Sequence, residues 1–492
     1  MSTNLQKIDH LVVLMLENRS FDNVLGRLYA SDNSEPFRNP PRGQSFDGVA
    51  GKNLSNPLPG GEGVVPVGIS RDLSDPSPDP GEEFEHVTRQ LGDGRMDGFV
   101  VDYIQHFQQS EGRTPTPDEF SVIMNGFTPA ELPVLSGLAR NFAVCDRWFA
   151  SVPSQTLCNR VFSQSATSRG FVNNKPIPKW LLTRSKTIFE LLSEAGLDWS
   201  VFYDELDLMP LTRLVQPTLW RGYDTHFKGM ASFHQQAASG TLPPYSFLEP
   251  RFFLDHNDAH PPLTKQFLVT SSVAAAELLV NSVYDALRKG PGWEKTLLVV
   301  TFDEHGGCYD HVPPPAATPP LPRGAAGEAG FCFDRLGVRV PAILVSPWVE
   351  AGSVIHTELD HTSLIRTVAA RWGLDPLTER DRAANDLGEA LSLPMARTDQ
   401  VELTPHPYTP NAEHAAAPLN PLQRYILEAV AAYEAVHQLP DEGSVEEKLK
   451  TAWQLLQKET KIAGLKTVGE ATDYLASRLD PETGWLGGTY VQ

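Results

Sequence analysis

The chain has 492 residues and a formal net charge of −20 at pH 7, with a pI near 5.1. This acidity argues against nucleic acid as a partner and against electrostatic docking on anionic lipid, because both need basic groups. It leaves zwitterionic lipid open as a substrate. Hydrophobic residues make up 41% and charged residues 21%, which indicates a globular protein rather than a disordered one.

Cysteine usage and apolar runs exclude further classes of protein. The 4 cysteines show no CxxC spacing, which indicates neither a disulfide framework nor a sulfur-ligated zinc site. Cys308 and Cys332 could pair, and the sequence leaves this open. No apolar run reaches membrane-spanning length, so we expect no transmembrane segment. The N-terminus lacks the features of a signal peptide, so we expect a cytoplasmic protein or a processed exported one.

The first predicted element is a strand at residues 11–16 that runs directly into Glu17 and Asn18. A fully apolar run of this length is typical of a strand buried on both faces of a sheet. Asn18 and Ser20 could both serve as caps for a short helix that follows. We expect Ser20 to be the cap, and Glu17 and Asn18 to be metal ligands.

The middle of the chain alternates helices and strands, which is typical of α/β folds. Before this alternation, residues 30–81 are rich in Pro, Gly, Ser, Asn and Asp, which predicts a long irregular segment bordering the functional site. The predicted helices are 82–91, most of 118–139, 187–196 and 273–289, and the predicted strands are 142–146 and 199–203.

A second fully apolar strand, at residues 296–300, leads to Asp303 and Glu304. If the two apolar strands lie side by side, their carboxyl ends bring these two residues to Glu17 and Asn18. Three carboxylates and a carboxamide form an oxygen-rich site for one divalent cation, with Ca²⁺, Mn²⁺, Mg²⁺ and Zn²⁺ all open. The alternative is a solvated acidic strand end.

The C-terminal part predicts one more strand, at 337–348, and a helix at 364–372. After residue 404 the functional motifs stop, and amphipathic helices are predicted at 419–437, 445–465 and 468–478. We therefore expect a catalytic domain at residues 1–404 and an α-helical extension at residues 405–492. The whole should be a three-layer α/β/α sandwich with a mostly parallel central sheet and the site at its carboxyl edge.

Four stretches together resemble the phosphoesterase family, which holds bacterial phospholipases C, plant non-specific phospholipases C and certain acid phosphatases. They are IDHLVVLMLENRSFDNVLG, SQTLCNR, TFDEHGGCYDHVPPP and GVRVPAILVSPW. The resemblance covers residues 8–371 in the family's order. It implies an alkaline phosphatase-like fold, since the family belongs to that superfamily.

The resemblance implies that Thr156 is the nucleophile, followed by the family's Asn-Arg pair as Asn159 and Arg160. Cys158 replaces the family's proline. A hydroxyl at a helix start receives backbone N–H donors, and an adjacent cation lowers its pKa. We expect Thr156 also to contact the metal held by Glu17, Asn18, Asp303 and Glu304. The alternative is that Thr156 only caps a helix.

A histidine is expected to assist the reaction. His260 matches the family's Asn-Asp-x-His-Pro motif and would bind the phosphoryl group or protonate the leaving group. One departure is Glu82, which stands where the family commonly has a histidine; His86 could replace that histidine, although we expect it to be a surface residue. The roles of four further histidines stay open: His256, His305, His311 and His361.

The residues and the resemblance together predict a metal-dependent phosphoester hydrolase of phospholipase C type. It would cleave glycerophospholipid phosphodiesters through a phosphothreonine intermediate. One alternative is an acid-phosphatase-type phosphomonoesterase, and another is a non-catalytic, metal-stabilised binding protein. The head group of the substrate and the oligomeric state stay open.

Overall fold

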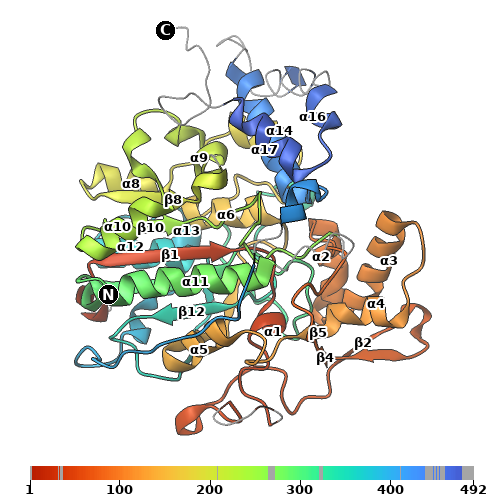
Figure 1. Cartoon of the computed structure of the whole chain (residues 1–492), viewed down its shortest axis with the longest axis horizontal. Coiled ribbons are helices and arrows are strands. Elements are labelled where there is room, and N and C mark those ends of the chain that lie inside the picture. Colours follow the sequence, from red (N-terminus) through yellow and green to blue (C-terminus); the bar gives the residue numbers. More distant parts are fainter. Residues whose placement is uncertain are drawn as a thin grey trace.

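The centre of the molecule is an 8-stranded sheet in the order β13-β6-β12-β11-β1-β10-β8-β9 (Figure 1). The computed structural model describes residues 3–31, 33, 37–207, 209–263, 272–320, 325–409, 412–437, 447, 450–451, 454 and 460–478. The two apolar runs form the middle strands, β1 (His10–Leu16) and β11 (Thr296–Phe302), which pair in parallel. Every residue of β11 is buried, and each apolar side chain buried in this way contributes roughly 1.5–3 kcal/mol.

The sheet is mostly parallel, as the sequence predicts. Only β12 runs antiparallel to its neighbours β11 and β6. The predicted strand at 337–348 is confirmed only in its centre, at Ala342–Val345. Arg339, before this strand, instead forms an isolated bridge with Phe149. The remaining strands of the sheet are β6 (Ala143–Cys145), β8 (Trp199–Tyr203), β9 (Phe227–Gly229), β10 (Tyr245–Leu248), β12 (Ala342–Val345) and β13 (Ser353–Ile355).

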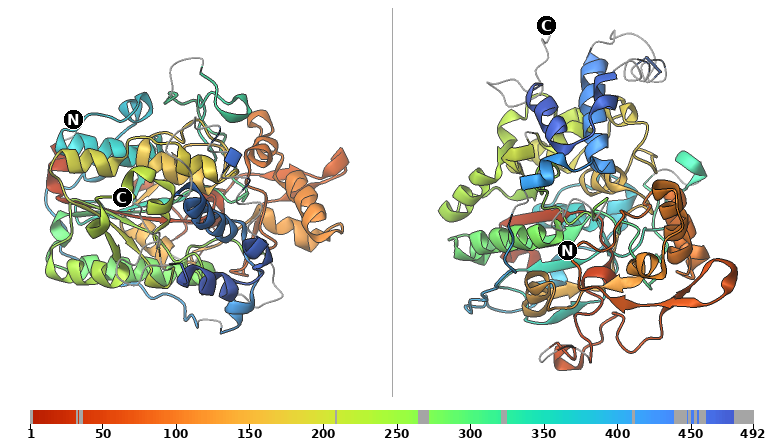
Figure 2. Two further views of the ribbon diagram at one scale, coloured as in Figure 1. Left: turned by 90° about the horizontal axis from the view of Figure 1, so that it is seen from above. Right: turned by 45° about the vertical axis from the view of Figure 1, so that its right-hand side comes forward.

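Helices cover both faces of the sheet, which confirms the three-layer sandwich (Figure 2, left). One layer contains α5 (Pro133–Asn141), α10 (Met230–Ser239) and α11 (Ser272–Lys289). The other contains α6 (Thr156–Ser165), α8 (Ile188–Glu194) and α12 (Thr362–Trp372). Four short elements lie outside these helix layers and the main sheet: α1 (Phe21–Val24), α13 (Glu379–Ala383), β7 (Trp148–Phe149) and β14 (Leu359–Asp360).

Local capping explains where several helices begin. Ser20 accepts a hydrogen bond from the Asn23 backbone N–H, so it caps α1 as predicted. Thr187 and Glu190 form a capping box at the start of α8. The prediction that 118–139 is mostly helical is confirmed at both ends of this range, with a non-helical break between them. The chain forms α4 (Pro117–Ser121), leaves the helix at Asn125, and starts α5 at Pro133.

The irregular segment leads into a lobe at the carboxyl edge of the sheet (Figure 2, right). It contains a hairpin of β2 (Ser55–Pro57) and β3 (Val64–Pro66), and β4 (Gly68–Ile69) pairs with β5 (Asn125–Gly126). Helices α2 (Phe84–Leu91) and α3 (Phe99–Glu111) share a separate hydrophobic cluster with Val65 of this hairpin. The end of the segment reaches the strand ends of the main sheet, as described below.

The C-terminal helices pack on the main domain through a second hydrophobic cluster. Helices α14 (Pro421–His437) and α17 (Val468–Ala476) share this cluster with α7 (Pro178–Leu182) and α9 (Leu211–Val215). These two helices confirm the predicted helical extension. Most of the predicted helix at 445–465 lies outside the described residues, apart from α16 (Thr460–Gly464) at its end. The domain boundary at residue 404 stays a prediction.

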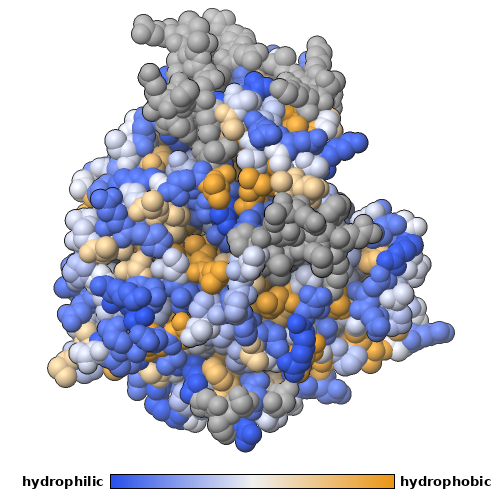
Figure 3. Space-filling model, viewed as in Figure 1, coloured by the Kyte–Doolittle hydropathy of each residue, from blue (hydrophilic) through white to orange (hydrophobic). Residues whose placement is uncertain are grey.

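The surface and the cysteines agree with the composition. Figure 3 shows a mainly hydrophilic face on which apolar residues form small patches. In the described part of the chain, no helix is both long and apolar enough to span a bilayer. The structure resolves the question of a disulfide between Cys308 and Cys332, since both are free thiols.

Candidate active site

The predicted metal ligands meet where β1 and β11 end. Leu16 pairs with Phe302, so Glu17 and Asp303 are neighbours on adjacent strands. The backbone N–H of Asn18 donates to Asp303 Oδ1 at 3.1 Å. Glu17, Asn18, Asp303 and Glu304 are all fully buried, which rules out a solvated acidic strand end.

Three oxygens of these four residues are suited to bind a cation. Asn18 Oδ1, Asp303 Oδ2 and Glu304 Oε1 are buried and accept no hydrogen bond from the residues that the structure describes. Burying a carboxylate oxygen without a partner is costly unless a cation compensates it. The donor set is hard and oxygen-rich, and it therefore fits a divalent metal ion.

Thr156 lies against the same group, at the first residue of α6. Its Oγ1 donates to Glu17 Oε2 at 3.1 Å. Gln155, rather than Thr156, is the N-cap residue of the helix. The Thr156 hydroxyl is therefore directed at Glu17 and does not act as a cap. Glu17, Asn18, Asp303 and Glu304 are called the acidic group below.

The two motif residues after Thr156 have different partners. The Asn159 side chain donates to Val152 O and Ser154 O at 3.1 and 2.8 Å, and accepts from Val152 N–H at 2.9 Å. It therefore holds the loop that leads to Thr156. Arg160 Nε donates to Glu17 Oε1 at 2.6 Å and lies 3.6 Å from Asp303 Oδ2. The sequence identified Arg160 only as a motif match, and the structure adds it to the site.

Glu82 is the other residue that the sequence pattern missed as a component of the site. Its Oε2 accepts a hydrogen bond from Asn18 Nδ2, and its Oε1 accepts one from Gln155 Nε2 at 3.3 Å. Burial, followed by repulsion from Glu304, raises the pKa of Glu82 well above its usual value. The only signal for Glu82 in the sequence was its place in the family's histidine position. His86 does not take over this place, because its Nδ1 contacts Asp102 at 3.0 Å.

His260 reaches the site from the loop after β10. Its backbone N–H donates to Asp258 Oδ1 at 2.9 Å, and Asp258 O accepts from the Glu17 N–H at 2.7 Å. The His260 Nε2 lies 3.2 Å from Asn18 Nδ2. The structure therefore brings His260 next to the predicted ligands, on the side of Asn18 that faces Glu82. His256 is one step further away, with its Nδ1 2.8 Å from Asp258 Oδ1.

Comparison with known proteins assigns the chain to a family. It matches the phosphoesterase family over residues 8–375, which is most of its length. The chain belongs to the phosphoesterase family. It is therefore an enzyme that hydrolyses phosphoric esters, and the alternative of a non-catalytic binding protein is not supported.

Several relatives match this family member over most of both chains. Non-specific phospholipase C3 of Arabidopsis thaliana is 35% identical over 420 residues, which cover 80% of this chain and 75% of that protein. Non-specific phospholipase C1 of the same plant is 37% identical over 407 residues, or 76% and 69% of the two chains. Phospholipase C B of Mycobacterium tuberculosis is 28% identical over 459 residues, or 84% and 81%.

Solved structures match this chain more distantly. The phosphonate monoester hydrolase of Agrobacterium radiobacter aligns with a TM-score of 0.32 and 14% identity, over 55% of this chain and 74% of that one. The lipoteichoic acid synthase LtaP of Listeria monocytogenes aligns with a TM-score of 0.31 and 11% identity, over 68% and 87%. Likenesses this remote carry no information about the phosphoesterase site.

Backbone conformation explains how the acidic loops of this phosphoesterase approach so closely. Asn18 has a φ of 54°, and Gly306 has a φ of 59°. A Cβ atom added at Gly306 would lie 2.2 Å from Asn18 O, and one added at Gly307 would lie 2.6 Å from Pro80 Cβ. Both glycines are therefore needed for the β11 loop to pack directly on Asn18 and on the segment that carries Glu82.

His305 and His361 form hydrogen bonds within and next to the loop that follows β11. His361 Nε2 lies 2.6 Å from Asp303 O, and the Trp148 indole donates to His361 Nδ1 at 3.3 Å. Because a carbonyl oxygen only accepts, His361 donates through Nε2 and orients Asp303 through its backbone. His305 contacts Gln90 Oε1 through Nε2, at 2.8 Å. Both histidines therefore contact residues around the acidic group.

A separate, buried polar cluster connects the loops that follow β1 and β11. Asp22, Asp310 and His311 could by distance bind a metal ion. However, the Arg339 guanidinium donates to Asp310 Oδ1 at 2.9 Å and to Asp22 Oδ1 at 3.0 Å. A cation is therefore already present, and we interpret the cluster as a structural clamp.

This clamp predicts a pH-dependent stability. Burial lowers the pKa of His311, but hydrogen bonds to Asp22 and Asp47 outweigh it and raise the pKa to about 9. The stabilisation is complete below the unfolded pKa of ~6.5 and is lost as the pH rises through the folded value. His311→Gln should therefore lower the free energy of unfolding by about 2–3 kcal/mol near pH ~6 and by little near pH ~10.

Denaturant titrations at both pH values measure this difference. His356→Gln removes a histidine whose side chain is 46% exposed, and it serves as the control. An equal loss of stability at the two pH values would contradict a charged His311.

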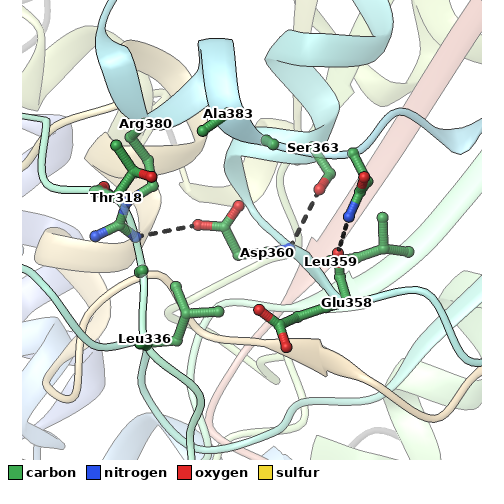
Figure 4. A pocket seen from close by; sticks show the side chains of 12 residues that line it. Thr318, Leu336, Glu358, Leu359, Asp360, Ser363, Arg380 and Ala383 are labelled. Atoms are coloured by element: carbon green, nitrogen blue, oxygen red, sulfur yellow. Dashed lines mark hydrogen bonds and ion pairs between the residues drawn. The ribbon is translucent and has the colours of Figure 1, made fainter.

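A surface cavity of about 140 Å³ is lined by residues 316–318, 336, 358–360, 363, 380 and 383–385. Figure 4 shows Asp360 on its wall, between Arg380 and Ser363. Asp360 Oδ2 accepts from Ser151 Oγ at 2.8 Å and from Arg380 Nη1 at 3.4 Å. Neither Thr156 nor any predicted metal ligand is among its lining residues. The cavity therefore lies outside the acidic group.

Proposed function

We propose that this phosphoesterase is a metal-dependent phospholipase C that acts through a phosphothreonine intermediate. Thr156 Oγ1 would bond to phosphorus as the bond from phosphorus to the diacylglycerol oxygen breaks. Water would then break the bond between Oγ1 and phosphorus and release the phosphorylated head group. The phosphodiester substrate is supported by the names of the relatives, which are phospholipases C.

The assignment of Thr156 as the nucleophile is supported by the 3.1 Å hydrogen bond from Thr156 Oγ1 to Glu17 Oε2. Glu17 Oε2 is thus placed to receive the hydroxyl proton as Oγ1 attacks. Burial raises the pKa of Glu17 well above its usual value, and the Arg160 guanidinium acts against this rise. Arg160 therefore favours the ionised form of Glu17, and its hydrogen bond to Glu17 Oε1 leaves Oε2 directed at the hydroxyl.

We propose one divalent cation at this point, held by Glu17, Asn18, Thr156, Asp303 and Glu304. Three buried oxygens, of Asn18, Asp303 and Glu304, accept no hydrogen bond from the residues that the structure describes, and they support this set. When bound, the cation would lower the pKa of the Thr156 hydroxyl and neutralise charge on the phosphoryl oxygens. Asn159 contributes by holding the loop before Thr156.

The role of His260 in the reaction stays a prediction. Its Nδ1 lies 2.8 Å from Pro261 O, so Nδ1 carries the proton of a neutral ring. Burial lowers the pKa of His260, which favours that neutral form. Its Nε2 then only accepts, and it could not protonate a leaving alkoxide without first gaining a proton. These hydrogen bonds argue for a positioning or ligand role.

The substrate class can be tested directly. We expect kcat/KM for a short-chain phosphatidylcholine to exceed that for p-nitrophenyl phosphate by about tenfold or more, at the same pH and metal concentration. The acidic chain repels a dianionic monoester more than a zwitterionic lipid, although salt screens this effect. Thr156→Ala, purified in parallel, controls for contaminating phosphatase. A tenfold preference for the monoester would instead support the acid-phosphatase alternative.

A further inference from the structure

A serine, a histidine and an aspartate meet at one end of the central sheet, away from the acidic group. Strands β6 and β13 pair in parallel with Cys145 opposite Ile355, so Asp146 and His356 follow them at adjacent positions. His356 Nδ1 lies 2.9 Å from Asp146 Oδ1, and His356 Nε2 lies 3.1 Å from Ser45 Oγ. We propose that these three residues form a second catalytic site, which hydrolyses carboxylic esters. This activity goes beyond the proposed phosphodiester hydrolysis and does not depend on it.

The three groups are connected in the order that nucleophilic catalysis requires. A carboxylate only accepts hydrogen bonds, so the neutral His356 ring carries its proton on Nδ1, and its Nε2 accepts from the Ser45 hydroxyl. The Asp146 side chain is 0% exposed and the His356 side chain 46%, and Ser45 is exposed. The carboxylate is therefore buried behind the ring, and the hydroxyl is open to a substrate. Such a triad is recognised by this geometry rather than by position in the chain.

Hydrogen bonds on both sides of the serine hold its loop against the end of β13. Gln44 Oε1 accepts from the Val354 N–H at 3.0 Å, and Gln44 Nε2 donates to Gly352 O at 2.9 Å. The backbone N–H of Asp47 donates to Asp146 Oδ2 at 2.9 Å. The serine is therefore placed beside the histidine by contacts that do not involve its own side chain. Such a fixed position reduces the entropy lost in the attack.

In the proposed reaction, Ser45 Oγ bonds to the carbonyl carbon of the ester as its proton passes to His356 Nε2. The bond from this carbon to the alcohol oxygen then breaks, and His356 Nε2 gives the proton to that oxygen. Water, deprotonated by the same nitrogen, breaks the acyl-serine bond, and the proton returns to Ser45 as the carboxylic acid leaves. Asp146 is a positioning residue, which orients the ring and stabilises its charged form.

The loop also supplies donors for the oxygen on which negative charge develops. Within the part of the chain that the structure describes, the backbone N–H groups of Ser45 and Phe46 have no hydrogen-bond acceptor. The N–H of the residue after a catalytic serine commonly binds this oxygen. Because the site is open to water, such stabilisation is weaker than in an enclosed pocket. We therefore expect slow hydrolysis, restricted to esters with a short acyl chain and a good leaving group.

Covalent labelling tests the nucleophile in protein that keeps the triad. In Thr156→Ala protein, which lacks the proposed phosphodiesterase nucleophile, a fluorophosphonate should react at Ser45 with loss of fluoride, and peptide mass spectrometry should locate the label. The double variant with Ser45→Ala should lose this label. Ser74→Ala is the matched control, because it removes another hydroxyl of the same irregular segment, one that donates to Asp72 Oδ1 at 2.6 Å. An unlabelled Ser45 in the Thr156→Ala protein would overturn the proposal.

Hydrolysis of p-nitrophenyl acetate measures the activity itself. Ser45→Ala and His356→Gln should each lower kcat by about 100-fold, the smaller effect expected of a general base. Asp146→Asn should lower kcat by about tenfold or more with little change in KM, whereas a loss of structure would change both. Thermal denaturation should show Ser45→Ala to be folded, since Ser45 is exposed.

The two proposed activities fail separately. Ser45→Ala should hydrolyse a phosphodiester like the unmodified protein, and Thr156→Ala should keep its ester hydrolysis. Ester hydrolysis at an unchanged rate in Ser45→Ala would overturn the second site. The hydrogen bonds among the three residues would then only fasten the loop to β13.

Discussion

Thr156→Ala should abolish turnover and leave the fold intact. The hydroxyl is the group that would form the bond to phosphorus, and its 3.1 Å hydrogen bond to Glu17 Oε2 places it at the acidic group. Loss of a covalent nucleophile typically lowers kcat by at least about 1,000-fold. Thermal unfolding should change little, because a methyl group remains at the start of α6. The kcat on a phosphodiester and a denaturation curve measure the two effects.

Ser163→Ala is a suitable control for this variant. It removes another buried hydroxyl from α6, and that hydroxyl donates to Arg160 O at 2.7 Å within the same helix. It should keep nearly full activity. Rapidly quenched enzyme should also yield a phosphorylated peptide containing Thr156, which is missing from Thr156→Ala. Hydrolysis at near-normal rates by Thr156→Ala with full metal occupancy would show that another group is the nucleophile.

Glu304→Ala should lose the metal ion and activity together. Glu304 Oε2 accepts from the Gly306 N–H at 2.7 Å, which fixes the side chain, and Oε1 is left without a hydrogen-bond donor among the described residues. Removing a carboxylate ligand should weaken metal binding by more than about 100-fold, since even residues behind the ligands change affinity by 10–100-fold. Metal content and kcat should be measured on the same preparation.

The variant Glu304→Gln separates charge from shape. It keeps the side-chain volume and the hydrogen bond to Gly306, so its fold should match that of the unmodified protein. It should still bind metal poorly, because an amide oxygen carries less charge than a carboxylate. Normal metal content in Glu304→Ala would mean that the oxygen-rich site is assigned to the wrong residues.

The sheet itself was well predicted because its strands have strong local signals. The runs before Glu17 and Asp303 are fully apolar, and such runs are stable only when both faces are covered. The strand β8 and the helix α11 were likewise predicted to within a residue. Within the mostly helical range 118–139, propensity alone did not reveal the break at Asn125 and Gly126, which pair with β4.

The residues that follow β1 and β11 were predicted as one group, whereas the contacts of Arg160 in α6 and of Glu82 with this group were not predicted. Arg160 contacts Glu17 from 143 positions away, and Glu82 contacts Asn18 from 64 positions away. The C-terminal extension also reaches the site, because Gln155 Nε2 donates to the Tyr425 hydroxyl at 3.2 Å, across 270 positions. No pattern of neighbouring residues encodes such contacts.

The sequence by itself determined the parallel strands, the acidic residues at their ends and the hydroxyl that begins α6. These features follow from the order of apolar, polar and turn residues over short stretches, where neighbouring side chains decide the backbone conformation. Only the tertiary structure decided that Arg160 pairs with Glu17 and that Glu82 joins His260 beside Asn18. These contacts depend on how distant segments pack, and close packing is possible there because Gly306 and Gly307 carry no side chain.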